Sequence, residues 1–345
     1  GTDIPVKSAG GSPPAPLTTG DRMDPLGRVQ ASVRQGLDAV ASEMDRSLSH
    51  DVPLVAQMGR HLMGMRGKMF RPTLVLLCSD TEGRSETKAV TLAAAVELIH
   101  LATLVHDDAV DHSVLRRGMP TLNSMFSHQI SVIMGDFLYS TALGQLVAAG
   151  DLEALRALTR ASTQMSVGEL RQLAVADHLS FSEADYYALI QAKTASLMSA
   201  ACEVGAMCGA MRYREPLMRY GEFLGMAFQI VDDLLDYTER KETTGKPTGL
   251  DLREHKVTLP LIAALREMSP ADRAKVDELF ADDEPGEAAI AEVSRMVSGA
   301  GGLEYARKRG ADYADKAREA LDGLPDTVAR DALIDSISYV MERHA

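Results

Sequence analysis

Apolar residues recur at spacings of three and four along most of the chain, from about residue 28 to the end. This is the period of an amphipathic α-helix, and the alternation typical of strands is scarce. The pattern predicts helices over 28–49, 52–65, 70–81, 86–111, 122–149, 151–176, 182–210, 214–238, 256–268, 270–281, 286–299, 301–323 and 326–343. The breaks contain Gly or Pro, as at 116–120 and 245–249. We therefore expect an all-α protein.

Three of these helices are apolar around much of their circumference, namely 86–111, 182–210 and 214–238. Helices of that kind lie at the centre of a bundle, surrounded by others. We expect one domain over residues 26–345, with the helices packed around a central core or cavity. Residues 1–25 are rich in Gly, Pro and Ser, which predicts a flexible tail, part of which could be left from cloning.

The composition excludes several classes of protein. Asp and Glu outnumber Lys and Arg by 49 to 36, giving a formal charge of -13, and no basic stripe with aromatics is present, so we expect no nucleic-acid partner. Glu97, Asp136 and Glu203 interrupt the most apolar stretches, so we expect no membrane span. The cysteines, all in apolar surroundings, are expected to be buried reduced thiols, which favours a cytoplasmic protein. They are Cys78, Cys202 and Cys208.

Two clusters of three aspartates end two of the apolar helices. They are Asp107, Asp108 and Asp111, and Asp232, Asp233 and Asp236. Within each cluster the spacing lets the three carboxylates share one helix face. The helix dipole disfavours an anion at this end by about 0.3–1 kcal/mol, so stability alone does not explain two such clusters. Either cluster alone could be a solvated helix end, but the pair suits Mg²⁺ with a phosphorylated ligand.

Basic and polar residues near the clusters support this interpretation. They are Lys68, Arg71, His100, Arg116, Arg117, Lys193, Thr194, Gln229, Lys246 and Lys256. Taken singly, a lysine or arginine is usually a surface charge, and His100 or Gln229 could be a buried polar residue of the core. Lys193 fits a surface position least well, because apolar residues stand on both sides of it. Together these cations could hold more than one diphosphate.

From about residue 50 to the end, the chain resembles the trans-isoprenyl diphosphate synthases, and most closely the bacterial polyprenyl diphosphate synthases. The motifs that carry the resemblance are "GKMFRP", "ELIHLATLVHDDAVDHSVLRRGMPT", "VIMGDFLYS", "GEL", "AKTASL", "FQIVDDLLDY" and "GKPTGLDLREHKVTLP". The resemblance implies an all-α homodimer with a central cavity in each subunit. In two places this chain departs from the family: His255 stands where Gly usually precedes Lys256, and Met69 stands where a basic residue is common.

The resemblance also assigns roles. It implies that an allylic diphosphate binds through three Mg²⁺ to the six aspartates, and that Arg116, Lys193, Lys256 and Lys246 contact it. It implies a metal-free basic pocket for isopentenyl diphosphate, formed by Lys68, Arg71, His100 and Arg117. Thr194 and Gln229 would then face the reacting carbons. The activity it implies is head-to-tail condensation: the allylic diphosphate ionises, isopentenyl diphosphate attacks the carbocation, and a proton leaves.

The product's growing tail is expected to run from Asp107 toward the start of the same helix. Residues about one turn before Asp107 would line its path, namely Ala102 and Thr103, then Ile99 and Val96. Short-chain members of the family carry an aromatic residue at one of the first two positions, and here both are small. One turn rises about 5.4 Å, roughly one isoprene unit, so we expect a product longer than geranylgeranyl. Ile133 and Phe137 are candidates for the tube's floor or for ordinary core.

Three other functions stay open from the sequence. A short-chain synthase, making farnesyl or geranylgeranyl diphosphate, would need a bulky residue elsewhere to close the tube. A class I terpene cyclase would share the first aspartate cluster, but its second motif normally mixes Asn or Asp with Ser or Thr and Glu. An inactive partner subunit of a heteromeric synthase tends to lose aspartates or basic residues, and both sets are complete here. Transient membrane contact during product release is a further hypothesis, motivated by the product's insolubility.

Overall fold

The structure is a computed structural model that describes residues 24–83, 87–239 and 249–343. Within these ranges it is almost wholly helical, and its one sheet is an antiparallel pair of two-residue strands, β1 (Leu115–Arg116) and β2 (Met119–Pro120). The all-α prediction is therefore confirmed. Most of the predicted tail, residues 1–23, lies outside the described residues.

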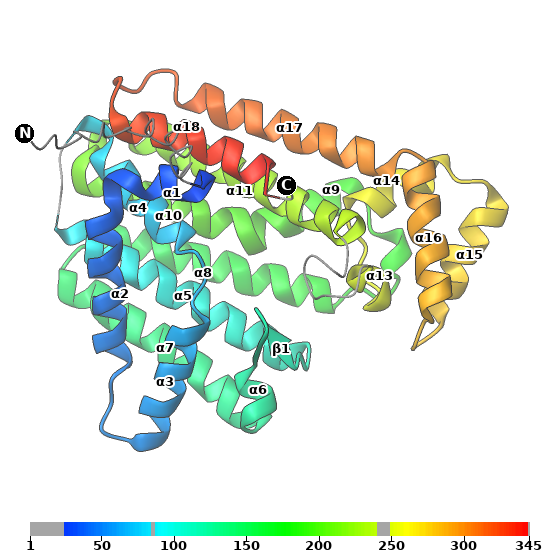
Figure 1. The fold of residues 1–345 in the computed structure, drawn as a ribbon, viewed down its shortest axis with the longest axis horizontal. Helices are drawn as coiled ribbons and strands as arrows, with labels where there is room; N and C mark the ends of the chain where they lie inside the picture. Colours follow the sequence, from blue (N-terminus) through cyan, green and yellow to red (C-terminus); the bar gives the residue numbers. More distant parts are fainter. Residues whose placement is uncertain (1–23, 84–86, 240–248, 344–345) are drawn as a thin grey trace, which may run out of the picture.

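The helices follow one another along the chain with short connections (Figure 1). In the first half they are α1 Pro25–Gln30, η1 Ala31–Val33, α2 Arg34–Leu48, α3 Pro53–Met65, α4 Phe70–Ser79, η2 Asp80–Glu82, α5 Lys88–Val110, α6 Leu122–Met125, α7 His128–Ala149 and α8 Leu152–Leu173. In the second half they are η3 His178–Ser180, α9 Glu183–Ile190, η4 Gln191–Ala195, α10 Ser196–Gly209, η5 Met211–Tyr213, α11 Arg214–Thr238, α13 Leu250–Arg253, α14 Leu259–Glu267, α15 Pro270–Ala281, α16 Glu287–Gly299, α17 Gly302–Ala320 and α18 Val328–Met341.

Most predicted helices are present within a few residues of their expected ends, and the differences have local causes. The predicted helix 122–149 is split into α6 and α7 because the Ser127 side chain caps a new helix by accepting a hydrogen bond from the Ile130 N–H at 3.1 Å. The predicted helix 28–49 is interrupted by the 3₁₀ turn η1. The break at 116–120 forms the hairpin of β1 and β2, which helix periodicity could not reveal.

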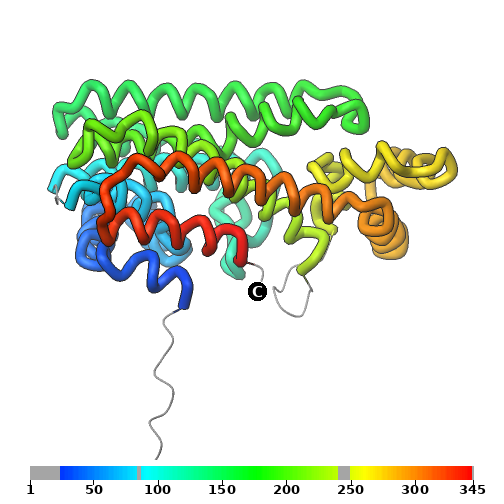
Figure 2. The backbone as a smooth tube through the Cα atoms, turned by 90° about the horizontal axis from the view of Figure 1, so that it is seen from above, coloured from blue at the N-terminus to red at the C-terminus, as the bar shows by residue number. Residues whose placement is uncertain are grey.

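α5, α10 and α11 form the centre of the bundle, as predicted from their apolar circumference, although the predicted helix 182–210 is divided into α9, η4 and α10. α5 packs against α2, α4, α7 and α10, while α10 packs against α4, α8 and α11. Seen from above, α8 forms one outer edge of the molecule and α17 and α18 cover the opposite side of α11 (Figure 2). The largest apolar cluster, which includes residues of all three central helices, lies between these layers.

Helix α10 lies unusually close to α4, and two glycines make this possible. A Cβ atom at Gly205 would stand 2.3 Å from the Val75 carbonyl oxygen, and one at Gly209 would stand 2.2 Å from the Ser79 carbonyl oxygen. No side chain fits in either gap. The two backbones are therefore in direct contact along this seam, which fixes α10 and the residues at its start relative to α4.

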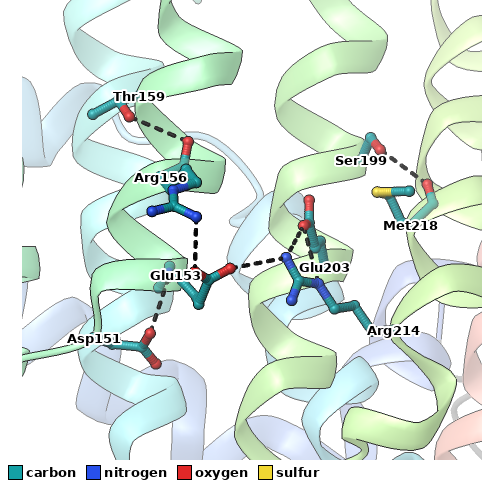
Figure 3. Close-up of polar contacts among 9 residues, drawn as sticks. Asp151, Glu153, Arg156, Thr159, Ser199, Glu203, Arg214 and Met218 are labelled. Carbon is teal, nitrogen blue, oxygen red and sulfur yellow. Dashed lines mark hydrogen bonds and ion pairs between the residues drawn. The ribbon is translucent and has the colours of Figure 1, made fainter.

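The interior of the bundle contains a buried ion pair near the start of α11. Glu203 of α10 is almost fully buried and accepts hydrogen bonds from the Arg214 Nε and Nη2 at 3.2 and 2.8 Å. Arg214 also lies 3.6 Å from Glu153 at the start of α8, so the arginine joins three helices (Figure 3). This contact explains a charge in an otherwise apolar helix, since the buried carboxylate has its partner.

By length and composition alone, two helices of the described chain, α5 and α7, could cross a membrane. On those criteria the expectation that Glu97 and Asp136 exclude such a span is too strong. In the most apolar part of α5, 67% of the residues are buried inside the protein, as expected for a core helix, but in α7 only 33% are. The prediction of buried thiols is confirmed for Cys78 and Cys202, whereas Cys208 is half-buried.

Candidate active site

The first aspartate cluster lies at the C-terminal end of α5. Asp108 is buried, and both of its oxygens accept hydrogen bonds from Arg116 of β1, from Nε at 2.9 Å and from Nη2 at 2.8 Å. Asp107 is half-buried, and this burial raises its pKa to about 6, although Lys193 acts in the opposite direction. Burial also raises the pKa of Asp111, opposed by Lys256. Among the described residues, no side chain or backbone group forms a hydrogen bond or ion pair with the carboxylate oxygens of Asp107 or Asp111, although charged groups lie near both.

The second cluster, at the end of α11, likewise contains aspartates that accept hydrogen bonds and one that is exposed. Burial raises the pKa of Asp233 to about 7, and its oxygens accept hydrogen bonds from the Tyr186 hydroxyl and from the Gln229 amide. Asp236 accepts from the backbone N–H groups of Leu250 and Asp251, each at 3.1 Å. Asp232 is exposed, with the Arg343 guanidinium 3.7 Å away.

Lys256 lies between the two clusters. Its ammonium is 3.1 Å from Glu254, and the charges of Glu254, Asp111 and Asp251 raise its pKa although burial opposes this. Asp111 belongs to the first cluster, and Asp251 donates its backbone N–H to the second. The structure therefore places Lys256 near carboxylates of both regions, while its predicted contact with a diphosphate stays a prediction. The other predicted lysine of this region, Lys246, lies outside the described residues.

Lys193 and Thr194 stand in the π-helical turn η4, between α9 and α10. Such turns insert an extra residue and are frequent at functional sites because they redirect side chains. Lys193 contacts Glu169 at 2.5 Å and donates a hydrogen bond to the Gln172 side chain at 3.0 Å. Thr194 donates to the Gln229 side-chain oxygen at 2.8 Å, so the two polar residues predicted to face the reacting carbons are in contact with each other.

Three of the four residues predicted to form a basic pocket come together, namely Arg71, His100 and Arg117. Arg71 of α4 lies with its Nη1 3.3 Å from the His100 Nε2 of α5. Arg117 of the hairpin donates to the Met65 carbonyl oxygen at 2.8 Å, and Lys68 is exposed in the loop before α4. Burial lowers the pKa of Arg71 to about 10, and burial together with the nearby arginines lowers the pKa of His100, so His100 is neutral here.

The predicted chain-length residues lie on α5 below the first cluster. Ala102 and Ile99 are buried, and Thr103 is half-buried with its hydroxyl donating to the His100 carbonyl oxygen at 2.6 Å. Ile133 is 65% exposed, so it is neither a floor residue nor core within this subunit. Phe137 is half-buried against the main core, with the His50 ring on its edge.

Both departures from the family pattern coincide with left-handed backbone. His255 has a φ of 57° and Met69 a φ of 58°. A glycine adopts this conformation without strain, which is a physical reason for the usual Gly before Lys256. His255 adopts this conformation although it is not glycine, and the Met69 side chain is buried in the main core.

The structure adds residues that sequence reasoning did not select. Glu97 is a buried carboxylate whose charge acts on Arg71 and Arg117, and Tyr186 holds Asp233. The Arg343 guanidinium lies 3.8 Å from the centroid of the Phe228 ring. Glu169 stands inside the "GEL" motif, which signalled its region but not its role. The others left no signal in the sequence, because their partners are distant along the chain.

The ligand chemistry of the site suits a hard cation bound together with a phosphate. Among the described residues, no three His, Cys, Asp or Glu side chains converge on a single metal position. Mg²⁺ is usually bound by one or two carboxylates, with waters and phosphate oxygens completing its shell. Asp107, Asp111 and Asp232 can supply such carboxylates.

The helical fold and the paired aspartate clusters define a prenyl diphosphate synthase, and the chain belongs to the polyprenyl synthetase family, whose model it matches over residues 52–297. It is 36% identical to the octaprenyl diphosphate synthase of Escherichia coli, over 92% of this chain and 99% of that protein. It is also 36% identical to the nonaprenyl diphosphate synthase of Mycobacterium tuberculosis, over 91% and 94%.

The fold is equally close to a solved member. A polyprenyl synthase of Caulobacter crescentus, crystallised with calcium and isoprenyl diphosphate, superposes with a TM-score of 0.88 at 36% identity, covering 93% of this chain and 98% of that one. The family and fold class expected from the motifs are therefore confirmed.

Proposed function

We propose that this protein condenses isopentenyl diphosphate with an allylic diphosphate and repeats the reaction to give a long-chain trans-polyprenyl diphosphate. The observation that carries the proposal is the presence of two aspartate clusters, with Lys256 near enough to Asp111 for their charges to act on each other, and of a separate basic pocket a short distance along α5. Two diphosphates need two such sites. The octaprenyl and nonaprenyl synthases among the relatives support the choice of a long product.

The allylic diphosphate would bind between the two clusters. Asp107, Asp111 and Asp232 are the carboxylates with oxygens left for Mg²⁺, and we expect three ions as in the family. The other three aspartates would act by holding parts of the site in place. Asp108 holds Arg116, Asp233 holds both Tyr186 and Gln229, and Asp236 holds the backbone of α13. The calcium in the Caulobacter structure supports a divalent-cation site.

The bound cations would neutralise negative charge on the diphosphate as the allylic carbon–oxygen bond breaks and the bonding electrons leave with oxygen. Lys193 and Lys256 would add positive charge at the same place. Lys193 is held by Glu169 and Gln172 without a diphosphate, so binding would exchange one of these contacts for a phosphate oxygen. Lys246 and Arg116 complete the predicted set.

Isopentenyl diphosphate would occupy the pocket of Lys68, Arg71, His100 and Arg117. Burial and neighbouring arginines keep His100 neutral, so it can donate one hydrogen bond without adding charge. The double bond would then attack the allylic cation to form the new carbon–carbon bond. A proton lost from the adjacent carbon would go, by family analogy, to the departing diphosphate. Thr194 and Gln229, hydrogen-bonded to each other, would face this reaction.

The protein is proposed to act as a homodimer in the cytoplasm. α7 and α8 leave large apolar side chains exposed, including Ile133, Val147, Leu170 and Leu173. α8 forms an outer edge of the subunit (Figure 2), and the exposure of these side chains leaves them available to a second copy. An apolar surface of this kind on two adjacent helices is typical of a protein–protein interface. Transient membrane contact during product release remains a separate hypothesis, which pelleting with liposomes during turnover would test.

The function is tested by incubating the purified protein with Mg²⁺, radiolabelled isopentenyl diphosphate and, separately, geranyl, farnesyl or geranylgeranyl diphosphate. The products are then separated by chain length, with Asp107→Ala as the inactive control. A ladder ending at about six units or more supports the proposal. Products that stop at three or four units would indicate a short-chain synthase. No elongation from any primer would favour a terpene cyclase or a silent partner subunit.

A further inference from the structure

His255 holds a conformation that a histidine normally avoids. Its φ of 57° lies in the left-handed region, where a Cβ atom crowds the backbone and where glycine is favoured. Such a residue persists only when its surroundings hold it there, and strained positions of this kind concentrate at functional sites. The question is what the His255 side chain provides that glycine would not.

The ring of His255 is anchored on α15. It stacks on Phe280, with ring centroids 5.3 Å apart and planes inclined by 28°. Its Nε2 lies 3.1 Å from the Leu279 carbonyl oxygen, so in the tautomer protonated at Nε2 it donates a hydrogen bond to that carbonyl. One side chain thus makes two directional contacts with consecutive residues near the end of a helix.

The same loop rests on the α15–α16 pair at a second point. Leu252 is fully buried in an apolar cluster that includes Leu279 of α15 and Ile290 of α16. Gly249 lies so close to Ile290 that a Cβ atom there would stand 2.5 Å from the Ile290 Cγ2. The two outlying helices therefore form the support under residues 249–258.

That loop carries Lys256, the residue after His255. The Lys256 backbone N–H donates to the Asp251 carbonyl oxygen at 2.7 Å, which closes the loop into a tight turn. The Lys256 side chain reaches into the negative field of Asp111, Glu254 and Asp251. A small rotation of the turn about His255 would move the ammonium away from this position between the two aspartate clusters.

We propose that His255 is a positioning residue: by docking on Phe280 and Leu279 it fixes the turn that holds Lys256 against the allylic diphosphate. This inference rests on the proposed role of Lys256. Glycine, the usual residue of the family at this place, would permit the turn but leave it without this anchor. In this chain the α15–α16 pair is thus part of the diphosphate site, although it contributes no residue that touches the ligand.

The variant that isolates the anchor is His255→Gly, because it relieves the backbone and removes the side chain that makes both contacts. Phe280→Ala removes the partner of the ring from a different helix, and His255→Asn keeps a residue that tolerates left-handed backbone if the glycine variant folds poorly. His50→Gly is the matched control, since His50 also makes a histidine–phenylalanine contact, with Phe137, at a position remote from Lys256. Melting temperatures would confirm that all four variants fold.

We expect His255→Gly and Phe280→Ala each to lower kcat/KM for the allylic diphosphate by about tenfold. Displacing a catalytic group such as the Lys256 ammonium by about 1 Å has an effect of this order or larger. KM for isopentenyl diphosphate, which binds in the other pocket, should stay within about twofold of the unmodified enzyme. Each change should also weaken binding of magnesium pyrophosphate, measured by calorimetry, by a similar factor. His50→Gly should change none of these values.

A double-mutant cycle with Lys256→Ala decides whether the effect passes through the lysine. If it does, adding His255→Gly to Lys256→Ala has little further effect. The inference is overturned if His255→Gly binds both substrates normally, if it weakens both equally, or if its effect adds in full to that of Lys256→Ala. These outcomes are distinct from failure of the proposed function, in which the unmodified protein would not elongate any primer.

Discussion

Both carboxylate oxygens of Asp108 accept hydrogen bonds from Arg116, one from Nε at 2.9 Å and one from Nη2 at 2.8 Å. We therefore expect Asp108, the second aspartate of the first cluster, to support the site rather than to bind a metal itself. The pair joins the hairpin to the end of α5 and fixes the orientation of its neighbours. The arrangement separates the aspartates expected to bind cations from the one that shapes the site.

This division predicts different results for neighbouring substitutions. Asp107→Asn should lower kcat/KM by about a thousandfold and raise the Mg²⁺ concentration needed for half-maximal rate, because a ligand is lost. Asp108→Asn, the matched control, should lower kcat/KM by about ten- to hundredfold, as expected of a supporting residue, with a smaller change in the Mg²⁺ midpoint. Initial rates over a Mg²⁺ titration measure both. Equal shifts in the two midpoints would contradict the division.

Asp233 predicts a pH effect on stability. Its folded pKa is raised to about 7 from an ordinary value of 3.8, so the folded protein holds a proton there that the unfolded chain has released. Charging this carboxylate therefore opposes folding: the effect is absent below about pH 4, grows as pH rises, and is complete above about pH 7. Without Mg²⁺ or substrate, the melting temperature should fall between pH 5 and pH 8.

Asp233→Asn removes this titration, so its melting temperature should fall less over the same range, by a few degrees. The comparison uses the difference in slope, which is independent of any constant loss from the altered hydrogen bonds with Tyr186 and Gln229. Asp107 does not feel Asp233 and titrates alike in both proteins, whereas the charge of Asp233 also raises the pKa of Asp251, so its removal reduces the fall further in the same direction. Parallel pH profiles would show that Asp233 is already charged throughout this range.

The small side chains of Ala102 and Thr103 on α5 predict how product length responds to larger substitutions. Ala102→Phe should shorten the product to about three or four units, because a ring placed about one turn below Asp107 fills the expected path of the tail. Ile99→Phe, lying deeper, should give a product of intermediate length. Reversed-phase separation of the labelled products measures this. Val328→Phe, an exposed apolar position on α18, serves as control. An unchanged ladder in Ala102→Phe would place the tail elsewhere.

The apolar faces of α7 and α8 predict the assembly state. Leu170→Glu, at a side chain 66% exposed in one subunit, should convert a dimer to monomers, because a charge would be buried in an apolar interface. Sedimentation velocity would show the change in mass. Met211→Glu, at another exposed apolar side chain outside α7 and α8, should leave the mass unchanged. A monomeric unmodified protein would refute the dimer outright.

The ion pair of Figure 3 predicts a stability difference between two arginines. Arg214→Leu should destabilise the protein by about 2–4 kcal/mol, because Glu203 would be left buried without a partner. Arg156→Leu breaks an exposed pair with Glu153 and should have an effect below about 1 kcal/mol. Replacing Glu203 and Arg214 together with leucine should recover much of the loss. Urea unfolding would measure all three, and similar losses for both single variants would be inconsistent with this account.

The sequence predicted the parts of the site that depend on local spacing. The two aspartate clusters can be found from the sequence alone. Their members stand at i, i+1 and i+4, within about one turn of a helix whose period is clear from its apolar residues. The small side chains at Ala102 and Thr103 follow from the same helix. Most helix ends follow from Gly, Pro and capping residues that stand at the ends themselves.

The division of labour within each cluster could not be predicted. Asp108 and Asp107 are identical in type, and only the folded hairpin brings Arg116 to one of them. Tyr186 stands 47 residues from Asp233, on another helix. The π-helical turn at Lys193 packs against α8 and α11, which are distant along the chain, and no local pattern marks it in the sequence. Tertiary contacts decide these features, and a single sequence does not display them.

The close seam between α4 and α10 has a consequence for how the molecule can change shape. Where backbone meets backbone at Gly205 and Gly209, no side chain is available to rotate or repack, so this wall is stiff. A product that lengthens unit by unit needs space that an empty active site does not require. That space must come from rearrangement of the side chains along α5 or from movement of helices away from the α4–α10 seam. We therefore expect the enzyme to deform on one side only.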